Sequence, residues 1–126
     1  MATFKAYTLA AAGQTGNNTH TGVEVTEDQG AQIALEFIVT VAGATPTVTY
    51  ALQGSYDGTN YDTTGISMIP ANTDTIAATR TVTAVAYYHS HVSQAQSRQY
   101  RYYRLVTTAN TNVTYNANLW VADGAS

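Results

Sequence analysis

The chain has 126 residues, no cysteine and a formal net charge of −3, and only 10% of its residues are charged. This length suits one domain that buries roughly two thirds of the surface of its unfolded chain. The lack of cysteine excludes disulfides and zinc-thiolate sites.

The same composition argues against nucleic acid and membranes as partners. Lys5 is the only lysine, and strand spacing puts Arg98 and Arg104 on the opposite side from Arg101, so these arginines need not form one patch against phosphates. No run approaches the ~20 apolar residues of a membrane helix. The N-terminal apolar stretch is too short for a secretion signal. We expect a chain that folds in a cytosol.

Residues 3–9 alternate weakly and predict an edge strand. Residues 10–22 carry three glycines with small and amide side chains, so they form either an exposed surface loop or the base of an N-terminal arm. Val23 and Val25 then indicate a short strand. We therefore divide the chain into residues 1–30, with the arm, edge strand and polar loop, and residues 31–126, the β domain.

The strongest strand signal begins at Ile33. Apolar residues occupy every second position through Val41, which is the period of a strand with one face in a core. Val48, Tyr50 and Leu52 resume the alternation after a turn at residues 43–46. The two runs predict an antiparallel pair joined by a short loop. Glu36 lies on the opposite side of the first run, facing outward or toward a neighbouring chain.

The middle of the chain gives weaker signals. Ile66 and Met68 form a short buried run that Pro70 ends or leaves at a sheet edge. A turn follows at residues 72–74. Residues 81–88 predict one strand whose inner face the alternation does not fix, and residues 89–99 predict a loop.

A second hairpin is predicted at the C-terminus. Residues 101–108 pair with residues 113–121 through a turn at residues 109–112. Every second residue from Val113 to Val121 is apolar. This hairpin and the preceding one share V-T-Y after the turn, which fits a two-layer arrangement. The sequence therefore predicts an all-β fold, an antiparallel β-sandwich or jelly roll.

No sequence pattern predicts a catalytic or metal-binding site. His89 and His91 could share a metal from one side of a strand, but their segment has no carboxylate to complete a site. The residues around Asp57 and Gly58 suit an ordinary Asp-Gly turn better than a calcium loop, which needs a longer ligand series. There is no nucleophile elbow or acid-base pair. We predict no catalytic residue, no metal and no cofactor, and we expect a protein that is not an enzyme.

The tyrosines point instead to contacts between proteins. The chain has ten tyrosines, and several flank the histidine segment, either as an interaction surface or as part of the sandwich wall. The residues predicted to contact a partner lie in this region and in the N-terminal segment: Phe4, Tyr7, Leu9, Tyr87, Tyr88, His89, His91, Arg101 and Tyr103.

Four motifs carry a resemblance to a known class. They are G-x-x-P-T-V-T-Y at residues 43–50, Q-G-S-x-D-G-x-x-Y at 53–61, R-Y-Y-R-L at 101–105 and T-x-V-T-Y at 111–115. Together they resemble small β-sandwich virion proteins of tailed bacteriophages. Size and composition are similar to capsid decoration, or cement, proteins, which bind the outside of the head shell and often form trimers. The resemblance implies a structural role at the capsid surface of the virion, with the major capsid protein and copies of this chain as partners. A tail or baseplate component would share the fold.

A second resemblance is weaker. S-x-D-G-x-x-Y and R-Y-Y-R-L also look like motifs of discoidin or galactose-binding jelly rolls, whose related modules bind glycans or lipids. Their ligand recognition lies in variable loops, so the resemblance implies no binding residue here. The chain also lacks the cysteine pair common in that family.

Overall fold

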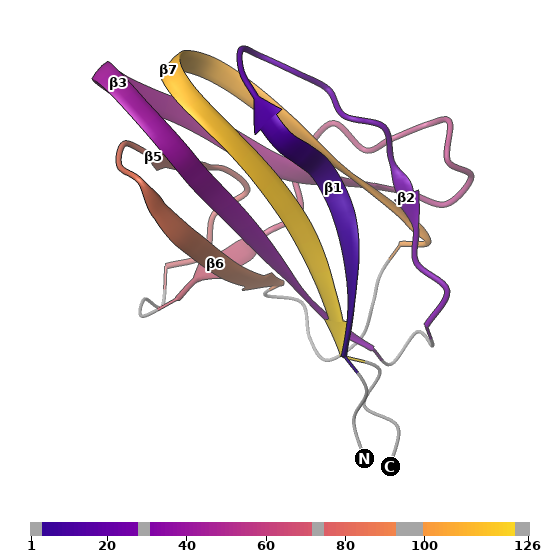
Figure 1. The fold of residues 1–126 in the computed structure, drawn as a ribbon. Coiled ribbons are helices and arrows are strands. Elements are labelled where there is room, and N and C mark those ends of the chain that lie inside the picture. Colours follow the sequence, from indigo (N-terminus) through magenta and orange to yellow (C-terminus); the bar gives the residue numbers. More distant parts are fainter. Residues whose placement is uncertain (1–3, 28–30, 72–74, 93–99, 123–126) are drawn as a thin grey trace.

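The computed structural model describes residues 4–27, 31–71, 75–92 and 100–122. These residues form strands and connecting segments and no helix, which confirms the predicted all-β class. The strands are β1 (Phe4–Gln14), β2 (Val23–Glu24), β3 (Gln32–Ser55), β4 (Met68–Pro70), β5 (Arg80–Val82), β6 (Ala86–Val92) and β7 (Tyr102–Ala122), and all pairs are antiparallel (Figure 1). The described residues include no helix that could span a membrane.

The long strands β3 and β7 form one ribbon that folds back over itself. Their register runs from Gln32 opposite Ala122 to Ser55 opposite Tyr102. Both strands bend at the same height, at residues 43–46 and 109–112 (Figure 1). Thr45, Ala109 and Asn112 have positive φ values of 43°, 52° and 57° at these bends. Beyond the bend the ribbon returns over its first half and creates two layers.

Each layer gains further strands at its sides. The first layer has the order β1, β7, β3, β6, β4, using residues 113–122 of β7 and 32–42 of β3. In the second layer, β2 pairs with β7 and β5 pairs with β3 on the other halves of the ribbon. The connection from β5 to β6 crosses between the layers at residues 83–85, beside the bends of the ribbon. The architecture is a β-sandwich, as predicted.

The two predicted hairpins are wrong. Residues 32–42 and 47–55 each pair with β7, and the two parts of β7 pair with β3. The alternation could not reveal this, because a hairpin and a folded ribbon point the same side chains inward. The predicted strand at residues 81–88 is also wrong, since β5 and β6 lie in different layers. The loop predicted from residue 89 is wrong as far as Val92, which ends β6; residues 93–99 lie outside the described residues.

The core confirms the predicted inner faces with one exception. Ile33, Leu35, Phe37 and Val39 are buried, as are Val48, Tyr50, Leu52 and all five apolar residues from Val113 to Val121. Phe37 stacks between two tyrosines, with ring centroids 4.1 Å from Tyr50 and 5.0 Å from Tyr115. Val41 is 56% exposed because it lies beside the bend.

The N-terminal segment is part of the sandwich. β1 is the predicted edge strand, but it continues from Leu9 to Gln14 and so takes in residues predicted as a loop or an arm base. Its pairing with β7 shifts between Thr8 and Ala10, and Ala10 is buried. Pro70 ends β4 at the far side of the same layer, as predicted. The turn predicted at residues 72–74 lies outside the described residues.

Candidate interaction face

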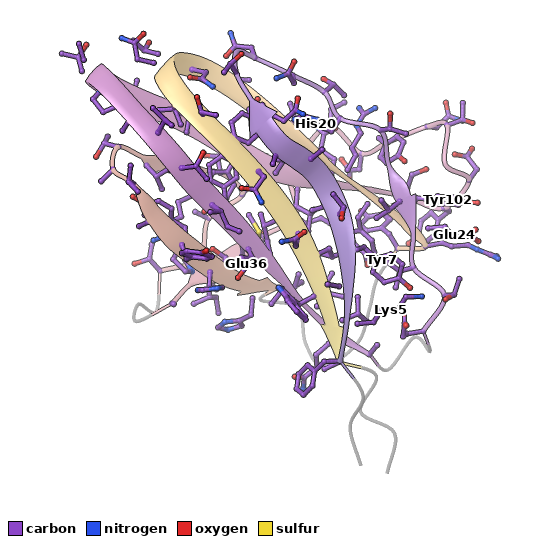
Figure 2. The ribbon with its side chains drawn as sticks, viewed as in Figure 1. Lys5, Tyr7, His20, Glu24, Glu36 and Tyr102 are labelled. Atoms are coloured by element: carbon purple, nitrogen blue, oxygen red, sulfur yellow. The ribbon has the colours of Figure 1, made fainter. Side chains whose placement is uncertain are left out.

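The outer surface of the first layer has Glu36 at its centre. Glu36 on β3 lies opposite His89 on β6 and Asn118 on β7. Because directly paired residues share one side of a sheet, all three point away from the core. The prediction that Glu36 faces outward is confirmed (Figure 2).

Glu36 is held by three donors from the neighbouring strands. Trp120 Nε1 and Asn118 Nδ2 donate to its Oε1, each at 3.1 Å, and His89 Nε2 lies 2.9 Å from its Oε2. Burial opposes ionisation of this carboxyl, but the hydrogen bonds from His89, Trp120 and Asn118 outweigh that effect and lower the pKa of Glu36. The carboxylate therefore fixes the Trp120 indole and the His89 imidazole on either side of itself.

Aromatic side chains surround this centre. Phe4, Tyr87 and Trp120 are 69%, 67% and 39% exposed, and the registers of β1, β6 and β7 place them on the same side of the layer as Glu36. Trp120 is flanked on its paired strands by Ala6 and Ala34. We call the set Phe4, Glu36, Tyr87, His89, His91 and Trp120 the outer aromatic face.

Four of the predicted contact residues come together on this face: Phe4, Tyr87, His89 and His91. Leu9 and Tyr103 do not, because they are 3% and 0% exposed and pack in the core. The prediction that Leu9 and Tyr103 contact a partner is therefore wrong.

The remaining predicted contact residues lie at the sides of the sandwich or on its second layer. The Tyr7 hydroxyl donates to Glu27 Oε1 at 2.5 Å, closing the side between β1 and the segment after β2. The Tyr88 hydroxyl donates to the Ala84 carbonyl at 2.7 Å. Arg101 Nε donates to Glu24 Oε2 at 2.6 Å. Sequence reasoning missed Glu36 and Trp120 as members of one face, although alternation in residues 113–121 already put Trp120 opposite the buried positions.

The outer surface of the second layer is covered by the chain itself. The Tyr61 ring lies over the Arg104 guanidinium at 4.1 Å, and Arg104 Nε donates to Gln53 Oε1 at 2.9 Å. The Tyr61 hydroxyl end packs directly on Gly22, where an added Cβ would lie 1.8 Å from the hydroxyl and would displace the ring. On the outer aromatic face Phe4 and Tyr87 are 69% and 67% exposed, whereas the Tyr61 ring of the second layer packs against Arg104.

A polar network lies between the layers near the bends. Tyr115, which is fully buried, shares hydrogen bonds of 2.7 Å with His20 Nε2 and 2.9 Å with Thr107 Oγ1, and Asn18 Nδ2 donates to it at 3.1 Å. Burial lowers the pKa of His20 and so favours its neutral form. These bonds attach the segment after β1 to β7, which is a structural role.

The Asp57 turn is also self-contained. Its carboxylate accepts bonds of 2.8 Å from the backbone N–H groups of Thr59 and Asn60, and these bonds, with that from the Asn60 amide, hold the pKa of Asp57 far below its usual range. Across the part of the chain that the structure describes, no three His, Asp or Glu side chains gather as a metal site would require.

Comparison with known proteins identifies the fold but not a family. No protein-family model matches the sequence, and no curated protein matches it. A solved structure, the crystal structure of SPBc2 prophage-derived protein YomS, superimposes with a TM-score of 0.67 over 97% of this chain and 95% of that chain. The two sequences are 6% identical. The chain thus shares the whole architecture of a prophage-derived protein.

Proposed function

We propose that this chain is a non-enzymatic structural protein of a phage particle that decorates the capsid by binding the outside of the head shell through the outer aromatic face. The observation that carries the proposal is the face itself, where one carboxylate holds the Trp120 and His89 rings and the exposed Phe4 and Tyr87 rings lie on the same side of the layer. Such a face offers apolar contact, and the hydrogen bonds that the carboxylate already accepts lower the cost of covering it with a partner. The fold shared with a prophage-derived protein and the motif resemblance support a phage setting.

The mechanism is adhesion. A protein that binds the assembled shell and not its free subunits shifts the equilibrium toward the shell by mass action. Low charge helps, because an array of strongly charged copies would repel one another. Many copies with modest contacts are sufficient.

The test starts from phage particles that lack the chain. Composition by mass spectrometry and the temperature at which heads burst are compared with and without the protein. We expect its addition to empty positions on the shell to raise the bursting temperature. Unchanged composition and an unchanged bursting temperature would rule out a cement. Labelling that places the chain at the tail or baseplate would keep a structural role and reject the head location.

The face is tested with matched variants. The double change Tyr87→Ser and Trp120→Ser should weaken attachment to heads by at least about tenfold, because large rings dominate protein contacts. Tyr56→Ser is the control, since Tyr56 is 71% exposed in the turn after β3. Equal losses in both proteins would exclude this face as the contact.

One observation favours a second function. A partly exposed Trp120 beside Glu36 and Asn118 joins an aromatic ring to polar groups, which is the chemistry of a glycan platform. Retention of the protein on a glycan array, abolished by Trp120→Ser, would support this alternative. No retention on any glycan would dismiss it.

A further inference from the structure

The end of the sandwich where the ribbon bends is a second surface, separate from the outer aromatic face. It consists of residues 15–19, 41–47, 83–85 and 107–113, which we call the folded end. Hydrogen bonds connect its segments: Asn110 N donates to Asn17 Oδ1 at 2.8 Å, and Asn112 Nδ2 donates to the Ala44 carbonyl at 2.7 Å. Residues 83–85 lie beside residues 41–47, because Val82 pairs with Val48 and Ala86 pairs with Val39, so the four segments occupy one end of the sandwich.

The folded end contains no charged residue. Its polar groups are Thr hydroxyls, Asn amides and backbone groups, which both donate and accept hydrogen bonds. A surface of this kind can pair with an identical surface, whereas a charged group near a two-fold axis would meet its own copy.

The shape of the folded end also suits pairing with an identical surface. Val85 is 59% exposed in the connection between β5 and β6. Beside the neighbouring bends lies an open groove lined by Gly16, Val41, Gly43 and other residues of these segments, together with the adjacent Thr114. Gly16 leaves room for an incoming side chain, because the position of its missing Cβ has no atom within 4 Å. One surface thus has both an apolar projection and a groove.

We propose that a second copy of this chain binds at the folded end, with Val85 of each copy seated in the groove of the other. A two-fold axis makes both contacts at once, because each residue pair of such an interface occurs twice. The proposal does not rest on binding to a phage shell. If the protein failed to attach to shells, the proposed dimer would not be contradicted. If the protein failed to self-associate, the proposed role of the outer aromatic face in shell binding would not be contradicted.

The experiment is sedimentation velocity on the purified full chain at about 1 µM to about 1 mM, a range that covers modest affinities. We expect the native protein to be a dimer at the upper concentrations. Val85→Glu should raise the dissociation constant by about a hundredfold or more, because the interface buries two carboxylates. Ile76→Glu is the matched control, since Ile76 is also 59% exposed but lies outside the folded end, and it should leave the dimer intact.

A rescue distinguishes a direct contact from a general effect of charge. Thr15, which is exposed at the groove, is changed to lysine. Thr15→Lys alone should weaken the dimer, and mixing it with the Val85→Glu protein should restore association by pairing the two charges. A native protein that stays monomeric throughout, an Ile76→Glu protein that dissociates equally, or a mixture without recovery would each overturn the proposal.

Discussion

At the scale of the residue, Tyr50 and Tyr115 form a natural comparison. Both are buried, both stack on Phe37, and both end a V-T-Y run after a bend. They differ at the hydroxyl. Tyr115 hydrogen-bonds His20, Thr107 and Asn18, whereas the buried Tyr50 hydroxyl faces Ser90 and Arg80 without forming a hydrogen bond of good geometry. Burial raises the pKa of Tyr50, so this hydroxyl remains neutral.

Removing each hydroxyl should therefore have opposite consequences. Tyr115→Phe leaves three polar groups without their shared partner and should lower the free energy of unfolding by about 1–3 kcal/mol. Tyr50→Phe removes an unsatisfied polar group and should change it by less than about 0.5 kcal/mol or increase it. Urea unfolding of both variants measures the difference. A larger loss for Tyr50→Phe would contradict this view of the core.

Glu36 is the other residue whose role can be isolated, because its partner Trp120 is the only tryptophan. Glu36→Gln weakens the bonds to three donors and should lower the free energy of unfolding at neutral pH by about 1–2 kcal/mol. It should also change the Trp120 emission spectrum. Thr49→Val, on the second layer, is a control that should leave the emission unchanged.

The pH dependence of this effect has a definite sign. The pKa of Glu36 is lower in the folded protein than in the unfolded chain, so its contribution is fully present above the unfolded value of about 4.3. The contribution is lost as the pH falls through the lower, folded value. The stability difference between the native protein and Glu36→Gln should shrink over that acidic range. A difference that stayed constant with falling pH would show that the charge is not involved.

At the scale of the element, alternation predicted the inner faces correctly but not the pairing. Val48, Tyr50 and Leu52 point inward whether residues 43–46 form a hairpin loop or a bend, so the pattern holds for both. Choosing between them requires the partner strand, which comes from residues 102–122. The positive φ of Thr45, a β-branched residue, was not foreseeable, because its side chain disfavours that conformation.

The candidate face was predictable in part for the same reason. The sequence places Tyr87, His89 and His91 in one region and Phe4 in the N-terminal segment, and only the register of β1, β6 and β7 shows that the two groups share a side. Trp120 follows from parity alone, since Leu119 and Val121 are buried. The bonds that fix it to Glu36 depend on strand neighbours that no local pattern specifies.

At the scale of the whole molecule, the folded ribbon connects the layers covalently. β3 and β7 each contribute to both layers, and their pairing continues on both sides of the bend. The aromatic stack at Phe37 crosses between the layers. One layer therefore cannot lose its packing without exposing the inner face of the other, and the sandwich should unfold as a single unit.

Native-state hydrogen exchange tests this coupling. Hydrogen-bonded amides in the centre of the first layer, near Phe37 and Ala117, should exchange with the same free energy as those near Leu52 and Leu105 in the second. That shared value should equal the free energy of global unfolding from urea titration. Amides of the edge strands β1 and β4 serve as the internal comparison, because strand ends and edges open locally at lower cost. If one central pair exchanged well before the other, the layers would be separate cooperative units, and the ribbon would act only as a linker between them.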